Sequence, residues 1–116
     1  MTFRFAVLVF ALVTLVSACG GSSGDGREVE IIATDSGCTP ASVTATTKEK
    51  LTFKIVNQAK GDREIEGIEG TKLDEVLIPA GRSRSINYKT PSSAGTQKLK
   101  CYIPGGPTTI IELRVS

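Results

Sequence analysis

The sequence predicts an all-β domain, a Greek-key β-sandwich of about seven or eight short strands. Three observations carry this prediction. From Arg27 onward apolar and polar residues alternate with a period of two, and turn-forming residues recur about every eight to twelve positions. No window carries the i, i+3, i+4, i+7 apolar stripe of an amphipathic helix. Short alternating strands separated by frequent turns are typical of a sandwich.

Five segments alternate cleanly, so that one face of each is apolar and the other polar. They span residues 28–33, 51–55, 85–88, 98–101 and 111–115. Weaker strand candidates lie at 42–46, 64–68 and 72–78. The turn formers between them are Gly61, Gly70, Pro79-Ala80-Gly81 and the segment 91–95.

The amino-acid composition excludes several classes of function. A chain of 116 residues is enough for one small domain, and it contains no histidine and no tryptophan. The lack of imidazole excludes a Ser/His/Asp triad and every His-ligated zinc or copper site. A net charge of +2 and only six Phe and Tyr residues argue against a nucleic-acid partner. No nucleophile–base pair is visible, so we expect no enzyme and no organic cofactor.

Residues 1–18 have the pattern of an export signal. Arg4 precedes an apolar run over 5–16, which is too short to span a bilayer core of about 30 Å. The following Val16-Ser17-Ala18-Cys19 resembles the bacterial lipobox. That resemblance implies that Cys19 becomes a diacylated residue 1, which anchors the exported chain to the bacterial cell membrane on its extracytoplasmic or periplasmic side. The alternative is a secretory signal with an incidental cysteine.

Residues 19–26 then form a lipidated cysteine and a flexible Gly/Ser tether, and 27–116 form the folded domain. A Gly/Ser chain of this length holds the domain roughly 15 Å from the membrane. Because Arg4 is the only charged residue of the signal, the mature chain stays nearly neutral. We therefore expect attachment by lipid and not by a polybasic patch.

Cys38 and Cys101 are the two cysteines left once Cys19 carries lipid. In an oxidising compartment they could form a disulfide, whose loop of about 63 residues would contribute roughly 4 kcal/mol on the chain-entropy model. The alternative is that both stay thiols and bind a metal that protects them from oxidation.

Several motifs occur in an order similar to that of a cupredoxin. They are Gly37-Cys38-Thr39-Pro40, then 51–57 (LTFKIVN), then Glu64-Ile65-Glu66, then Pro79-Ala80-Gly81, and a strand ending at Cys101. More narrowly, they resemble the cupredoxin domain of the EfeO-type bacterial iron-uptake lipoproteins, over about 29–115. The resemblance implies a cupredoxin-like sandwich that binds a metal at its loop end.

A type 1 copper site is excluded by this same comparison. Blue-copper centres need two His and one Cys. Here Glu64 stands where we expect the first His of the family, and no His follows Cys101, which stands at the copper-cysteine position. The resemblance leaves Cys38, Glu64, Glu66, Glu75 and Cys101 as metal-ligand candidates. Carboxylates suit ferric iron and thiolates suit cuprous copper, so this set allows an iron or a copper ion.

Glu64 and Glu66 lie on one face of their strand. If Ile65 packs inward, both carboxylates face solvent and are surface charge. EfeO-type proteins usually continue into a helical metal-binding domain, so this chain would be an accessory part that passes metal to a separate uptake protein or permease. The competing hypothesis is a disulfide-stapled sandwich that binds a protein or the cell envelope without metal.

Overall fold

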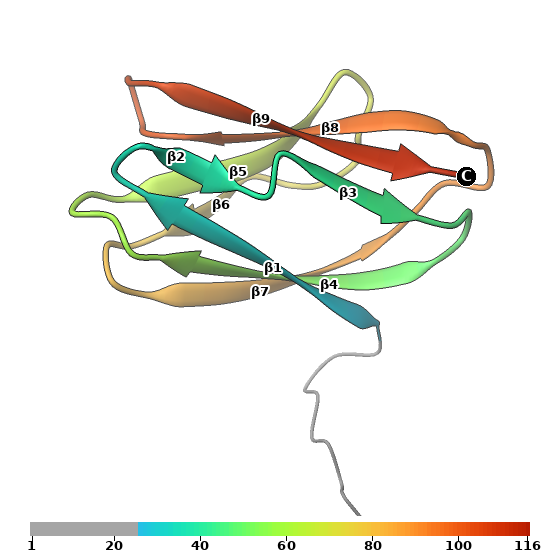
Figure 1. Cartoon of the computed structure of the whole chain (residues 1–116), viewed down its shortest axis with the longest axis horizontal. Helices are drawn as coiled ribbons and strands as arrows, with labels where there is room; N and C mark the ends of the chain where they lie inside the picture. The colour runs from blue at the N-terminus through green and yellow to red at the C-terminus, as the bar shows by residue number, and fades with distance from the viewer. Residues whose placement is uncertain (1–25) are drawn as a thin grey trace, which may run out of the picture.

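The computed structural model describes residues 26–116, which form a two-layer β-sandwich (Figure 1). The signal 1–18 and Cys19 lie outside the described residues, as does the tether up to residue 25. None of the described residues belongs to a helix that could cross a membrane. The sandwich confirms the predicted fold class.

The strands are β1 (Arg27–Thr34), β2 (Gly37–Thr39), β3 (Ser42–Ala45), β4 (Lys50–Asn57), β5 (Arg63–Ile68), β6 (Val76–Ile78), β7 (Ser83–Lys89), β8 (Gly95–Tyr102) and β9 (Thr108–Val115). One sheet has the order β2-β1-β4-β7 and the other β3-β9-β8-β5-β6. The pairs β1–β4 and β3–β9 are parallel, and every other pair is antiparallel. The chain changes sheets repeatedly, and these crossovers produce the Greek-key topology.

The strand count is nine in the described part, against the seven or eight that the sequence predicts. The added strand is β2, whose three residues are too short to show alternation. The candidate strand at 72–78 is also shorter than predicted, since only 76–78 are paired. Its first half is irregular and mostly exposed, but Leu73 within it packs into the core.

The core lies between the sheets and comes from the alternating positions that the sequence marks as apolar. The largest side chains below 2% exposure are Ile31, Leu51, Phe53, Ile55, Asn57, Ile65, Ile78, Leu99, Cys101, Ile111 and Leu113. Phe53 and Tyr88 meet at a ring-centroid distance of 6.1 Å. All nine strands and this core lie within 27–115, so the described part is a complete folding unit.

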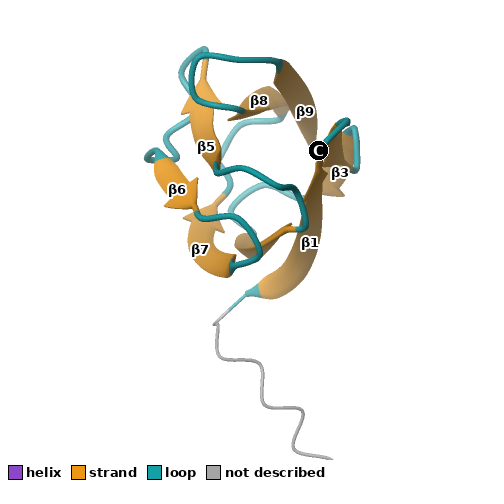
Figure 2. Cartoon of the chain, turned by 90° about the vertical axis from the view of Figure 1, so that its left-hand side faces the viewer, coloured by secondary structure: helices purple, strands orange, loops and turns teal. Residues whose placement is uncertain are grey.

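The sandwich has two ends that matter for function. At the cysteine end lie the turn at 35–36 and the loops 58–62, 79–82 and 103–107, which face the viewer in Figure 2. At the opposite end, which we call the lysine end, lie Gly26, the connections 46–49 and 90–94, and the first residues of the connection 69–75, which runs back along β5 to β6.

Candidate functional site

A disulfide between Cys38 and Cys101 closes the cysteine end. Cys38 lies in β2 of one sheet and Cys101 in β8 of the other, with their Cα atoms 6.4 Å apart. Their residues are only 6% and 1% exposed. The bond therefore joins the two layers across the core, which confirms the disulfide alternative.

Arg63 is a buried charged group that lies beside this disulfide. It is 4% exposed and lines a cavity of about 150 Å³ with Cys38, Cys101 and the loop residues around them. Its Nη2 donates to the carbonyl of Thr34 at 2.9 Å, and its Nη1 donates to the carbonyl of Asp62 at 3.1 Å. Among residues 26–116 no carboxylate forms an ion pair with Arg63. Arg63 thus ties the start of β5 to the end of β1.

Sequence reasoning did not select Arg63, although a signal was present. On a strand with Ile65 facing inward, residue 63 must also face inward. The structure therefore places Arg63, and not Glu64, on the inner side of the sheet at the loop end.

Asn57 organises the loop that follows β4. Its side-chain amide donates to the carbonyls of Gly61 at 3.0 Å and Ile78 at 2.9 Å. Its side-chain oxygen accepts the backbone N–H of Ala59 at 3.0 Å. Because Asn57 is 1% exposed, these bonds satisfy its polar atoms inside the protein and fix the path of the chain toward Arg63.

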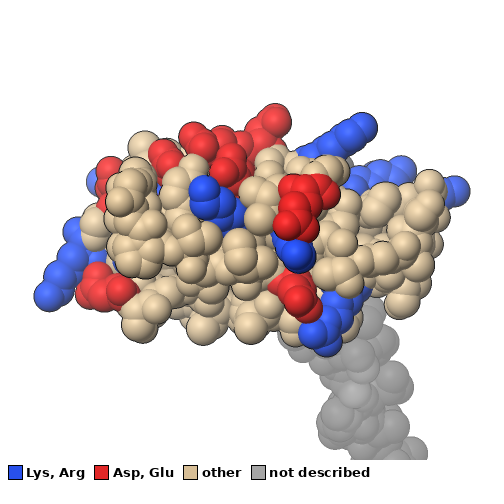
Figure 3. All heavy atoms as spheres, turned by 90° about the horizontal axis from the view of Figure 1, so that it is seen from above, with Lys and Arg blue, Asp and Glu red and all other residues tan. Residues whose placement is uncertain are grey.

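Glu64 and Glu66 lie on the outer face of the five-stranded sheet, because Ile65 between them is fully buried. In the β5–β8 pair Glu64 stands opposite Tyr102, and Glu66 stands opposite Lys100. The Glu66 carboxylate is 3.8 Å from the Lys100 ammonium, which sits 4.1 Å from the Tyr102 ring centroid. Figure 3 looks onto this outer face and shows acidic side chains gathered along one edge.

Glu75 precedes β6 and joins the same surface. Its carboxylate accepts the hydroxyl of Tyr102 at 2.6 Å. This hydrogen bond, the neighbouring Glu64 carboxylate, partial burial and the charge of Glu66 raise the pKa of Tyr102 well above its usual value. The three predicted carboxylates therefore gather around a neutral phenol and a lysine.

A family comparison identifies the fold to which these residues belong. The family described as "cupredoxin-like domain" matches residues 5–111, which are most of the chain. The chain belongs to the cupredoxin-like domain family. None of the curated proteins compared with it is similar enough to be counted as a relative.

Solved structures similar to this cupredoxin-like domain include two with copper in their descriptions and a reduced auracyanin. Reduced auracyanin from Roseiflexus castenholzii matches with a TM-score of 0.64 at 15% identity, over 80% of this chain and 99% of that one. A copper binding protein in the apo form matches with a TM-score of 0.61 at 15% identity, over 77% of this chain and 86% of that one. The metal binding domain of the Cu(I) exporting ATPase CopA from Streptococcus pneumoniae D39 matches with a TM-score of 0.59 at 17% identity. The match covers 82% of this chain and 91% of that one. At these identities the likeness shows the fold alone.

The five predicted ligands of the cupredoxin-like domain are not brought into one coordination shell. The sulfurs of Cys38 and Cys101 are bonded to each other and offer no thiolate. The three carboxylates project from the opposite side of the sheet. In the described part of the chain no three Cys, Asp or Glu side chains lie close enough to hold a metal ion. The oxidised arrangement therefore does not fit a resident metal, and metal binding by these residues stays a prediction.

Proposed function

We propose that this cupredoxin-like protein is an exported, membrane-tethered binding module whose sandwich is stapled by Cys38–Cys101, and that it is not an enzyme. The disulfide is the observation that carries the proposal. By the family resemblance Cys101 stands at the copper-cysteine position, and a sulfur in a disulfide cannot ligate a metal as thiolate. Electron transfer through a type 1 copper centre is therefore not the function we propose.

Export and lipidation at Cys19 are part of this proposal. The signal pattern of 1–18, the lipobox-like 16–19 and the Gly/Ser composition of 20–26 support it. The disulfide agrees with it, since such bonds persist in oxidising compartments outside the cytoplasm. We expect Cys19→Ser to abolish incorporation of labelled palmitate in the native host and to release the protein from the membrane fraction. A variant that keeps both would contradict lipidation at Cys19.

A second candidate function is metal binding after reduction, and one observation favours it. Cys38 and Cys101 both line the cavity at the cysteine end, so a small dithiol could reach the bond. Such a reductant would transfer two electrons and two protons, become a disulfide itself and leave two adjacent thiols. Two thiolates suit cuprous copper or ferrous iron. In that state the domain would relay a copper or iron ion to an EfeO-type uptake protein or a permease.

Native mass spectrometry of residues 27–116 separates the two functions. The protein is purified without chelator and offered copper(I), iron(II) or zinc, before and after dithiothreitol. We expect a mass two hydrogens below the full-thiol value, with no bound ion in the oxidised state. One stoichiometric ion after reduction, lost in Cys101→Ala but kept in Glu64→Gln, would establish the metal function. An ion on the oxidised protein that Glu64→Gln removes would instead assign it to the carboxylates.

A further inference from the structure

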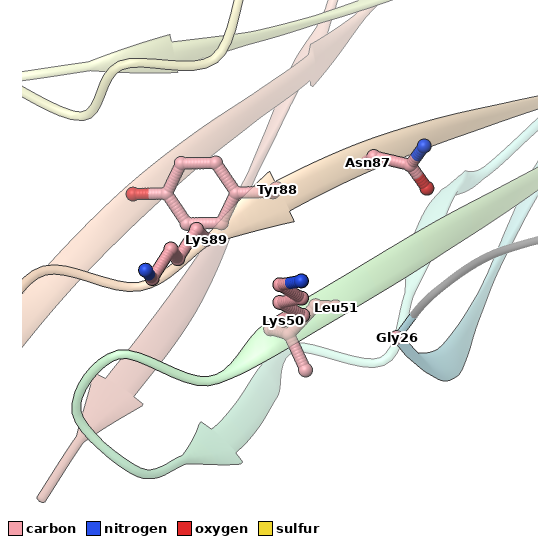
Figure 4. A pocket seen from close by; sticks show the side chains of 6 residues that line it. All are labelled: Gly26, Lys50, Leu51, Asn87, Tyr88 and Lys89. Atoms are coloured by element: carbon pink, nitrogen blue, oxygen red, sulfur yellow. The ribbon is translucent and has the colours of Figure 1, made fainter.

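Four exposed lysines gather at the lysine end, and the proposed function does not use them. Lys50 stands directly opposite Lys89 in the β4–β7 pair. Both line a hollow of about 300 Å³ that also includes Gly26 and Tyr88 (Figure 4). Lys72 joins Lys89 at an adjoining hollow of about 460 Å³. The backbone N–H of Lys48 donates to the Pro91 carbonyl at the rim of that second hollow.

No carboxylate forms an ion pair with these lysines within the described residues, although Glu69 and Asp74 lie in the same connection as Lys72. The two hollows are lined without any Asp or Glu. The four ion pairs found among residues 26–116 use other cations, namely Arg27, Lys98, Lys100 and Arg114. Glu49 is between Lys48 and Lys50 in sequence, but its carboxylate binds Arg27 at 2.9 Å. Like charges directly opposite each other on paired strands are destabilising, so the Lys50–Lys89 pair favours binding of an external anion.

The lysine end is also where the described part of the chain begins. The backbone of Gly26 packs on Lys50, because a Cβ atom at Gly26 would lie 2.6 Å from the Lys50 carbonyl carbon. Residue 26 is thereby held beside the lysines. Six residues lie between Cys19 and Gly26, and these seven residue steps reach about 25 Å at full extension. A domain tethered through Cys19 would therefore be held with its lysine end near the bilayer.

We propose that Lys48, Lys50, Lys72 and Lys89 dock on anionic phospholipid headgroups and turn the cysteine end away from the membrane. This inference rests on the proposed tether at Cys19. Headgroup charge is screened over about 8 Å at physiological salt, so the lysines act only on a domain already held close. The nearly neutral net charge predicted no polybasic patch, but folding collects lysines that are scattered in sequence onto one end.

The test attaches the protein to vesicles by chemistry that replaces lipidation. The chain 19–116 is coupled through the Cys19 thiol to maleimide-bearing lipid, in vesicles with or without phosphatidylglycerol. A small water-soluble acylating reagent then labels the lysines, and peptide mapping by mass spectrometry gives the labelling rate of each. On anionic vesicles we expect Lys50 and Lys89 to label about fivefold more slowly than on neutral ones. Lys60, in the loop 58–62 at the cysteine end, and Lys100, on the outer face of β8, should keep their rates.

Two charge variants complete the test. The protection of Lys48 and Lys72 should fall in Lys50→Gln/Lys89→Gln and persist in the matched Lys60→Gln/Lys100→Gln. High salt should abolish it. Equal labelling on neutral and anionic vesicles would overturn the docking surface. A failure of cells to lipidate Cys19 would overturn the proposed tether alone, because the maleimide coupling does not depend on it.

Discussion

The two ends of the sandwich are closed by different means. At the cysteine end a disulfide, a buried arginine and a buried asparagine fix the loops from inside. At the lysine end the closing element is the buried Thr90, whose hydroxyl accepts the N–H of Glu49 at 2.8 Å and donates to the Thr46 carbonyl at 2.6 Å. The first end is fixed by a covalent bond and by buried polar side chains, whereas the second has no covalent link among residues 26–116 and presents a cluster of four lysines to solvent.

This difference shows how the fold separates its stability from its outward contacts. Cys101, which by the family resemblance stands at the position of the copper-binding cysteine, forms a structural disulfide here. The four clustered lysines, Lys48, Lys50, Lys72 and Lys89, lie at the far end instead. A change at the cysteine end should therefore cost mainly folding free energy, and a change at the lysine end should cost little of it.

The largest expected effect comes from removing the disulfide. In Cys38→Ala/Cys101→Ala the unfolded chain regains the freedom of a loop with a separation of 63 residues. We expect the free energy of unfolding to fall by about 4 kcal/mol, measured by urea denaturation with far-ultraviolet circular dichroism. Dithiothreitol should destabilise the parent protein similarly and leave the double variant unaffected. An unchanged urea midpoint would mean that hydrogen bonds alone hold the cysteine end.

Two asparagines allow the ends to be compared directly. Asn57→Ala removes three hydrogen bonds of a buried side chain and leaves the Ile78 carbonyl without that donor. We expect a loss of about 3 kcal/mol. Asn87→Ala, at an exposed position of β7, removes only the bond from the Thr52 hydroxyl and should cost less than about 1 kcal/mol. If urea denaturation gave equal losses in the free energy of unfolding for the two variants, the two ends would not differ in how firmly their side chains hold the fold.

Most of the fold could be predicted from the sequence, because alternation reports burial on a strand directly. Positions such as Phe53 and Ile111 are predicted and found inside. The strand β2 was missed because three residues carry no period. Leu73 is buried on an irregular segment, so its burial does not follow from a strand pattern.

Less of the candidate site could be predicted. The count of cysteines favoured a disulfide but left a thiolate pair open, and only the distance between β2 and β8 selects the bond. The burial of Arg63 was not predicted because charged residues are ordinarily exposed. Arg63 lies two residues before Ile65 on the same strand, so it faces the same inner side. The Lys50–Lys89 pair depends on the β4–β7 register, which joins residues 39 positions apart.

A smaller effect is expected at the lysine end, and it depends on pH. Burial of the Glu49 carboxylate raises its pKa, but hydrogen bonds from Thr46 and Arg27 and the Arg27 charge outweigh this, so the pKa of Glu49 lies below its ordinary value of 4.5. A pKa lowered by folding means stability that is present above the ordinary value and is lost as the pH falls through the lowered one.

Glu49→Gln should therefore lower the Tm at neutral pH by less than Asn57→Ala does. The difference from the parent protein should shrink as the pH falls below 4.5. Thermal melts across this range measure it. Glu30→Gln is the control, since the Glu30 carboxylate makes no ion pair within residues 26–116. A difference that does not vary with pH would mean that the Glu49 carboxylate contributes through packing and not through its charge.

The smallest effect is a local one on the outer face of the five-stranded sheet. Glu75→Gln removes the charge that accepts the Tyr102 hydroxyl, so the pKa of Tyr102 should fall toward its usual value. Phenolate absorbance during an alkaline titration measures this pKa. The variant Tyr102→Phe isolates the signal of Tyr88. Burial raises the pKa of Tyr88, although its hydrogen bond with Gln97 acts in the opposite direction. Glu112→Gln, on β9 of the same sheet, should leave the titration unchanged. An unchanged Tyr102 pKa in Glu75→Gln would mean that Glu75 does not hold the phenol, and its carboxylate would then be available to a cation, as the metal hypothesis requires.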